Sequence, residues 1–325
     1  MSTLPQRRLG ADGPRISGVG LGCMSASWGY HLHSHDDARS EATLRRALEL
    51  GVTHFDTATL YGGGHNEKLV GRALGDVRDR PGGVVLASKC GLARTGFPRK
   101  KTVRDGTPET LRKQCDESLA RLGVEYLDLY YLHRVDPDVP VEESFGALKE
   151  LVVEGKVRRL GISECTVEEL ARAHATHPVS ALQSEFSLWT RVPLIDHIPW
   201  CSANGVSFVA FGVLGRGFLT GTLPADTTFP KGDFRAGNPR FQREAMKANQ
   251  AIVDGVRRVG ERLGATPAQV CVAWVLAQGD HLLPIPGTQR TEHLEENLGG
   301  ATLVLDAEAL SELDALPAAV GARYP

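Results

Sequence analysis

Short hydrophobic runs alternate along this chain with longer segments in which apolar residues recur every three or four positions. The short runs predict buried strands, and the longer segments predict amphipathic helices. Regular alternation of the two is typical of βαβ units, which build a parallel sheet. The predicted strands are, in chain order, 18–22, 54–56, 84–89, 127–133, 158–163, 181–184, 207–212 and 281–285.

Helical segments follow these strands one by one, so the pattern predicts a single (β/α)8 barrel over residues 1–325 with no dividing linker. Gly51 is placed to end the first helix, and Thr107-Pro108 suits the start of the third. Asp12-Gly13 predicts the turn of an N-terminal β-hairpin. Helices are expected at 37–50, from 66, from 107, at 141–154, 167–175, after 193, at 242–263, 267–278, 291–298 and, as an extra C-terminal element, 307–316.

Composition limits the classes of function. The chain has 325 residues, enough for such a barrel, and its formal charge of −2 argues against non-specific nucleic-acid binding. No apolar run reaches the ~20 residues of a membrane helix, and segment 1–8 has no apolar core of signal-peptide length. The six cysteines are scattered without a Cys-x-x-Cys pair, so we expect no disulfides, no zinc site and a cytoplasmic location. No pattern indicates an oligomeric state.

Polar residues at the ends of successive predicted strands form a candidate catalytic group. Asp56, Lys89 and His133 each end a strand, and Tyr61 follows Asp56 by five positions. Strand ends of this kind meet at the mouth of a barrel, where the active sites of barrel enzymes lie. A phenol has a pKa of ~10, and a neighbouring cation lowers it. We therefore expect Tyr61 to be a general acid acidified by Lys89, Asp56 to keep Lys89 charged, and His133 to hold a carbonyl oxygen.

Short motifs recur in a fixed order along most of the chain. They are Phe55-Asp56-Thr57-Ala58, Tyr61-Gly62, Ser88-Lys89-Cys90-Gly91, 127–133, Gly161-Ile162-Ser163-Glu164, 183–187, 214–221, 284–290 and Leu294-Glu295-Glu296-Asn297. At these motifs the chain resembles the aldo-keto reductase superfamily, and the resemblance covers roughly residues 7 to 315. It implies the barrel, a hairpin that closes the barrel bottom, and NADPH-dependent reduction of an aldehyde or ketone to the alcohol by hydride transfer.

The chain has no good Rossmann fingerprint, because Cys23 occupies the third glycine position of 18–23. The resemblance implies instead that NADPH, in preference to NADH, lies extended across the barrel mouth. Arg290 stands at the start of the predicted helix 291–298. An Arg at a helix N-terminus suits a phosphate ester, which also favours NADPH. The implied contacts are Ser163 and Gln183 on the carboxamide, Phe211 on the nicotinamide ring, Gly212, Val213, Leu214, Gly215 and Gly217 on the pyrophosphate, Ile285, Gly287, Thr288, Gln289, Arg290, His293, Glu296 and Asn297 at the adenosine end, and also Gly22 and Asp56.

Four of these positions depart from the commonest pattern of the family. Glu164 stands where an Asn usually assists the carboxamide, and Phe211 replaces a stacking Tyr. Gly287 and His293 replace two residues that are frequently basic near the 2′-phosphate.

Aromatic residues supply candidates for the substrate pocket, and aromatic walls suit apolar carbonyl compounds. The long connection 215–243 is rich in glycine, proline and threonine and indicates a functional loop. The expected substrate contacts are Trp28, Tyr30, Tyr61, His133 and Trp189, with Phe97, Phe229 and Phe234 as further candidates.

Two alternatives stay open. One is an NADP(H)-binding sensor of the same fold with slow turnover, as in the family members that serve as potassium-channel subunits. The other is a metal-dependent hydrolase, suggested by the histidines of segment 31–35. Such enzymes need further His ligands after later strands, and none follows the fifth or sixth predicted strand, so we expect no metal.

Overall fold

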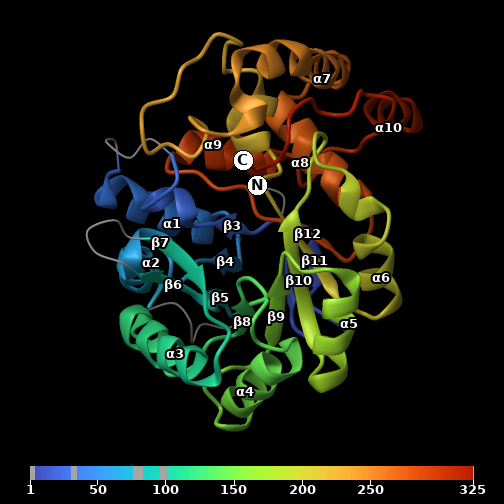
Figure 1. The fold of residues 1–325 in the computed structure, drawn as a ribbon. Coiled ribbons are helices and arrows are strands. Elements are labelled where there is room, and N and C mark those ends of the chain that lie inside the picture. The colour runs from blue at the N-terminus through green and yellow to red at the C-terminus, as the bar shows by residue number, and fades with distance from the viewer. Residues whose placement is uncertain (1–3, 31–34, 76–82, 96–100, 325) are drawn as a thin grey trace.

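The computed structural model describes residues 4–30, 35–75, 83–95 and 101–324. Within these ranges, eight parallel strands form one sheet in the order β12-β11-β10-β9-β8-β5-β4-β3 (Figure 1). The Gly20 amide, just before β3, donates to the Pro284 carbonyl of β12 at 2.9 Å, which joins the two edges. The (β/α)8 prediction is confirmed. The strands are β3 (Leu21–Gly22), β4 (His54–Asp56), β5 (Val85–Cys90), β8 (Leu129–Leu132), β9 (Leu160–Ser163), β10 (Val179–Glu185), β11 (Ser207–Phe211) and β12 (Leu282–Pro284).

Helices surround the strands on all sides in Figure 1, as the apolar stripes along the sequence predict. The apolar inner faces of the helices pack against the outer face of the sheet and form one hydrophobic core with it. Within the described ranges none is long and apolar enough to cross a membrane. The helices are α1 (Asp37–Glu49), α2 (His65–Leu74), α3 (Pro108–Leu122), α4 (Val141–Val153), α5 (Val167–Thr176), α6 (His197–Ala203), α7 (Arg243–Leu263), α8 (Pro267–Ala277), α9 (Thr291–Gly299) and α10 (Ala307–Asp314).

Local chemistry sets most helix starts. Thr166 and Thr266 form capping boxes with the residues three positions later, and Asp36 accepts the Arg39 amide at the start of α1. Thr107 occupies the N-cap position of α3 and Pro108 follows it, as predicted, but the Thr107 hydroxyl donates to Asp105 at 2.7 Å and makes no cap bond to the helix.

The N-terminal hairpin closes the bottom of the barrel, as predicted. β1 (Gln6–Arg8) and β2 (Arg15–Ser17) are antiparallel. Leu9 and Ile16 are buried with the inward-facing side chains of the strands, among them Tyr131. The opposite end, where the strands terminate in polar residues, is thereby left as the open mouth.

A second hairpin, β6 (Leu92–Thr95) with β7 (Lys101–Arg104), was not predicted. Its strands mix apolar and basic residues without regular alternation, so they give no strand signal. The predicted pocket residue Phe97 lies between these strands, outside the described residues.

The long connection after β11 contains two short 3-10 helices, Gly215–Thr220 and Pro239–Phe241. Asp233 and Arg235 form a buried ion pair at 2.7 Å within it. The Phe234 amide donates to the Gly29 carbonyl at 3.0 Å. The connection therefore packs on the loop that follows β3, beside the mouth.

Candidate active site

The four predicted catalytic residues meet at the mouth. Asp56 ends β4, Lys89 lies in β5, and His133 directly follows β8. Tyr61 begins a 3-10 turn, Tyr61–Gly64, in which Gly62 and Gly63 have positive φ, a conformation that glycine adopts without strain. All four side chains are buried.

Lys89 and Asp56 form a buried ion pair. The Lys89 ammonium donates to Asp56 Oδ1 and, at 2.8 Å, to the Thr57 carbonyl. The other Asp56 oxygen accepts the Gln183 amide at 2.8 Å. Burial disfavours the ammonium, but attraction to Asp56 and Tyr61 outweighs it, so the pKa of Lys89 lies above its usual value. Lys89 is therefore charged at neutral pH.

The Tyr61 ring lies over this pair, with the Lys89 nitrogen 5.3 Å from the ring centre. Burial raises the pKa of Tyr61, and Lys89 and Arg134 lower it by less, so the net shift is upward. The predicted net lowering of this pKa is wrong, because the sequence identifies the cation but not the depth of burial. A raised pKa keeps the phenol protonated, which is the form that can donate a proton.

His133 lies opposite Tyr61, with the two ring centres 6.0 Å apart. Burial and the nearby Lys89 and Arg134 charges hold the pKa of His133 well below its usual range. The imidazole is therefore neutral, and a neutral imidazole has one N–H to donate. Within the described part of the chain Nδ1 has no hydrogen-bond partner.

His54, two residues before Asp56, gives a test of the burial around this site. It is fully buried, neither ring nitrogen has a partner among the described residues, and burial lowers its pKa to about 4. The unfolded chain then binds more protons below about pH 6.5, so the free energy of unfolding falls as pH drops from about 6.5 to about 4, by roughly 3 kcal/mol for this residue.

We expect His54→Asn to abolish this part of the pH dependence of the unfolding free energy, measured by denaturant unfolding between these two pH values. The same substitution at His177 is the control, and identical pH profiles for all three proteins would contradict the burial.

A cavity of about 830 Å³ runs across the mouth from these residues. Arg290 and His293 line one end of its wall, and Ser163 and Gln183 lie near the catalytic residues. It is lined by the predicted cofactor residues Gly22, Asp56, Ser163, Gln183, Phe211, Gly212, Val213, Leu214, Gly217, Ile285, Gly287, Thr288, Gln289, Arg290, His293, Glu296 and Asn297, and among the predicted ones Gly215 is not in its lining.

Backbone packing around the cavity fits a dinucleotide. Gly212 and Gly217 have φ of 67° and 92°, which lets backbone amides approach a ligand closely. A Cβ on Gly22 would lie 2.8 Å from the Ile285 carbonyl, and one on Gly287 would lie 2.7 Å from the Gly22 carbonyl. These two loops touch only because both residues are glycine, and larger side chains would force the wall apart.

The predicted substrate residues divide into two groups. Trp28, Tyr30 and Phe234 line the cavity beside Tyr61 and His133, and the Trp28 and Phe234 ring centres are 4.8 Å apart. The placement of Trp189 in the substrate pocket is wrong: it is outside the cavity lining among the described residues and stacks on Phe218 at 5.1 Å. Phe229 likewise packs on Phe241.

The histidines of segment 31–35, considered as metal ligands, lie only partly within the described residues. His31 and His33 fall outside the described residues, and His35 hydrogen-bonds the Tyr30 carbonyl at 3.1 Å. Within the described ranges no group of His, Cys, Asp or Glu residues is arranged to hold a metal ion.

Several lining residues were missed by sequence reasoning. Arg134 directly follows His133, and its Nη1 donates to the His133 carbonyl at 2.6 Å and to Ser163 Oγ at 3.2 Å. Arg39 reaches the adenosine end from α1, where it donates to Gln289 at 3.2 Å. The position of Arg134 after a strand end could have signalled it. Nothing in the sequence connects α1 with the loop after β12.

Glu164 does not point freely into the cavity. Its φ is 55°, and its carboxylate accepts the Ser184 hydroxyl and the Glu185 amide, both at 2.8 Å. It also pairs with Arg323 at 2.7 Å. Burial raises the pKa of Glu164, but Arg323, Arg134 and the Glu185 amide together lower it by more, so the net shift is downward.

Comparisons with known proteins agree with this geometry. The model of the Aldo/keto reductase family matches residues 18–318. The chain is 40% identical to "Probable aldo-keto reductase 1" of Glycine max over 98% of this chain and 91% of the relative. It is 38% identical to "Aldo-keto reductase yakc [NADP(+)]" of Schizosaccharomyces pombe over 99% and 95%.

Solved structures agree as well. The glycerol dehydrogenase AKR11B4 from Gluconobacter oxydans matches with a TM-score of 0.86 and 31% identity, over 97% of this chain and 95% of that one. An aldo/keto reductase from Klebsiella pneumoniae, solved in complex with NADP and acetate, matches with a TM-score of 0.74 and 26% identity, over 99% of each chain. The chain therefore belongs to the aldo/keto reductase family.

Proposed function

We propose that this protein reduces an aldehyde or ketone to the alcohol with NADPH, with Tyr61 as the general acid. The observation that carries the proposal is the buried Lys89–Asp56 ion pair beneath Tyr61, with the His133 ring 6.0 Å from the Tyr61 ring in the wall of the same cavity. A relative named for NADP(+) and a similar structure in complex with NADP support the choice of cofactor.

Each residue of the site has one task. The neutral His133 imidazole donates a hydrogen bond to the carbonyl oxygen and fixes its position. The Tyr61 hydroxyl gives its proton to that oxygen, and the Lys89 ammonium stabilises the phenolate that remains. Asp56 keeps Lys89 charged. When bound, the cofactor supplies the hydride that no side chain can deliver.

We assign the parts of the cofactor to residues of the cavity wall. Ser163 and Gln183 would hold the carboxamide, and Phe211 would stack on the nicotinamide ring. Backbone amides of 212–217 would bind the pyrophosphate. Arg290, at the N-terminus of α9, and Arg39, from α1, are the cations for the 2′-phosphate.

The 2′-phosphate assignment predicts a change of cofactor preference. We expect Arg290→Leu to weaken NADPH binding by roughly 10- to 100-fold, because a hydrogen bond to a charged group contributes about 1.5–3 kcal/mol. Affinity for NADH, which lacks that phosphate, should stay within about twofold. Arg39→Leu should act in the same direction more weakly. Arg243→Leu, an exposed Arg at the start of α7, is the matched control in the same fluorescence titrations. Equal weakening of both cofactors would contradict the assignment.

The reaction itself is tested with a panel of carbonyl compounds. We expect apolar and aromatic aldehydes to be reduced best, since Trp28, Tyr30 and Phe234 form the wall beside Tyr61. The readout is loss of absorbance of the reduced nicotinamide, with NADPH and NADH compared at equal concentration. Tight NADPH binding without turnover of any carbonyl would favour the sensor instead.

A further inference from the structure

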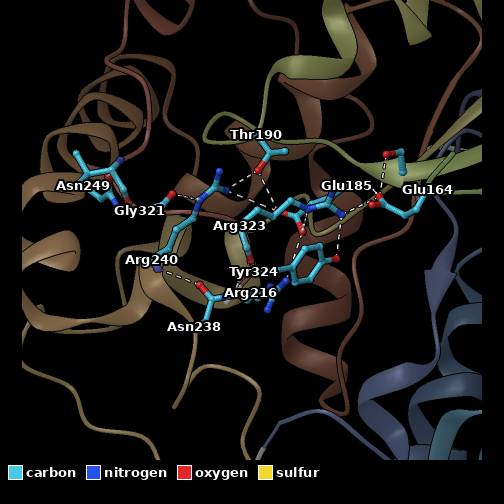
Figure 2. A network of polar contacts seen from close by, with 12 residues as sticks. Glu164, Glu185, Thr190, Arg216, Asn238, Arg240, Asn249, Gly321, Arg323 and Tyr324 are labelled. Carbon is cyan, nitrogen blue, oxygen red and sulfur yellow. Dashed lines mark hydrogen bonds and ion pairs between the residues drawn. The ribbon is translucent and has the colours of Figure 1, made fainter. Parts of the chain in front are cut away.

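The C-terminal segment 320–324 lies against the barrel mouth and is fixed there by Arg323 (Figure 2). Arg323 Nε donates to Glu185 at 2.8 Å, and its Nη2 pairs with Glu164 at 2.7 Å. The Arg323 guanidinium thus links Glu185, at the end of β10, to Glu164, directly after β9. Burial disfavours this cation, but the two carboxylates outweigh it and the pKa of Arg323 lies above its usual value.

The two carboxylates depend on cations for their stability. Glu185 is 3% exposed and also faces Arg216 at 3.5 Å and Arg240 at 3.7 Å. Removing one partner of a buried ion pair strongly destabilises the fold. The cluster therefore favours the arrangement in which both carboxylates keep their cations. Arg323 is the member that comes from the C-terminal segment.

Further contacts hold the same segment from the other side. Asn249 of α7, 1% exposed, bonds both the amide and the carbonyl of Val320, at 2.7 and 3.0 Å. Arg240 donates to the Gly321 carbonyl at 3.3 Å, and Asn238 donates to the Arg323 carbonyl at 2.9 Å. The segment is therefore clamped between α7, the long connection and the barrel mouth.

This clamp touches several residues of the cavity wall, among them Phe211 and Tyr324. The Arg323 guanidinium lies 5.7 Å from the centre of the Phe211 ring, and its Nη2 donates to the Tyr324 hydroxyl at 3.1 Å. Phe211 and Tyr324 both line the cavity, whereas Arg323 is not in its lining among the described residues. Arg323 therefore acts on a ligand through residues of the wall, which also include Asn238, bonded to the Arg323 carbonyl, and Arg216, paired with Glu185.

We propose that Arg323 is a positioning residue that retains the bound cofactor. By joining Glu164 and Glu185, it fixes the ring of Phe211 and sets Tyr324 in the cavity wall, which slows the departure of the dinucleotide. Glu164, which stands where an Asn usually assists the carboxamide, then serves as an anchor for the C-terminal segment. The inference rests on the proposed function, because it takes NADPH as the ligand.

The test measures cofactor binding and the C-terminal segment directly, without turnover. Stopped-flow fluorescence gives the association and dissociation rate constants of NADPH for the wild type, Arg323→Met and Glu164→Gln. Glu164→Gln removes the charge and keeps an amide oxygen for the bonds from Ser184 and Glu185, so it is the milder variant if Arg323→Met does not fold. Arg258→Met, which breaks an exposed ion pair with Glu312, is the matched control.

We expect both test variants to release NADPH about tenfold faster with an unchanged association rate constant, a difference of about 1.4 kcal/mol in binding. Hydrogen exchange at the Val320 amide should accelerate in the same variants and slow in the wild type when NADPH is added. Dissociation within twofold of the wild type in a folded Arg323→Met or Glu164→Gln protein would overturn the inference and leave the proposed function intact. If the wild type does not bind NADPH at all, the proposed function itself fails.

Discussion

Replacement of Tyr61 by phenylalanine is expected to lower kcat by about 10³-fold, because a positioned general acid contributes roughly 10²- to 10⁴-fold to such reactions. The change removes the hydroxyl and keeps the ring. The contacts of the Tyr61 ring with Trp28, at 5.8 Å, and with the Lys89 ammonium remain available. Folding and NADPH affinity should therefore stay close to those of the wild type.

Steady-state turnover with one aldehyde and saturating NADPH measures this loss. Tyr126→Phe is the matched control, because Tyr126 lies before β8, stacks with Arg158 at 4.2 Å and does not line the cavity. A folded Tyr61→Phe protein that retains near-full turnover would remove Tyr61 from the role of acid.

Lys89→Met is expected to reduce both activity and stability. It leaves the Asp56 carboxylate buried without its cation, which costs about 3–5 kcal/mol of unfolding free energy. It also removes the charge that stabilises a Tyr61 phenolate, so kcat should fall by at least about 10²-fold. Denaturant unfolding and steady-state turnover measure the two effects separately.

The double variant Lys89→Met/Asp56→Asn separates stability from catalysis. Replacing both members of a buried ion pair is often close to neutral for stability, so most of the unfolding free energy should return. Turnover should stay as low as in Lys89→Met, because the ammonium is still missing. If turnover returned together with stability, Lys89 would have a structural role and no part in the chemistry.

Much of the fold follows from the sequence because each barrel strand is a buried apolar run and each helix has an apolar stripe. The hairpin β6–β7 does not follow, because its short strands carry no such pattern. Trp28 and Trp189 are both predicted substrate contacts, yet Trp28 lines the cavity and Trp189 stacks on Phe218. Which aromatic ring reaches the cavity depends on packing between segments far apart in the chain.

In the candidate site, too, some features follow from the sequence and others depend on packing between distant segments. Asp56, Lys89 and His133 are predictable because the ends of parallel strands must meet at one mouth. The net shift in the pKa of Tyr61 is not, since it depends on how much water the loops exclude. Arg39 reaches the cavity from α1, and Arg323 contacts residues of its wall from the C-terminal segment; no spacing in the sequence signals either.

The most direct test of the account uses NADPH that carries deuterium at the position of the transferred hydride. After a single turnover with an aldehyde, mass spectrometry of the alcohol should find one deuterium bound to the former carbonyl carbon. The label should remain absent from the solvent. An unlabelled alcohol, or no alcohol from any carbonyl compound while NADPH stays bound, would contradict the assignment of this protein as an NADPH-dependent carbonyl reductase.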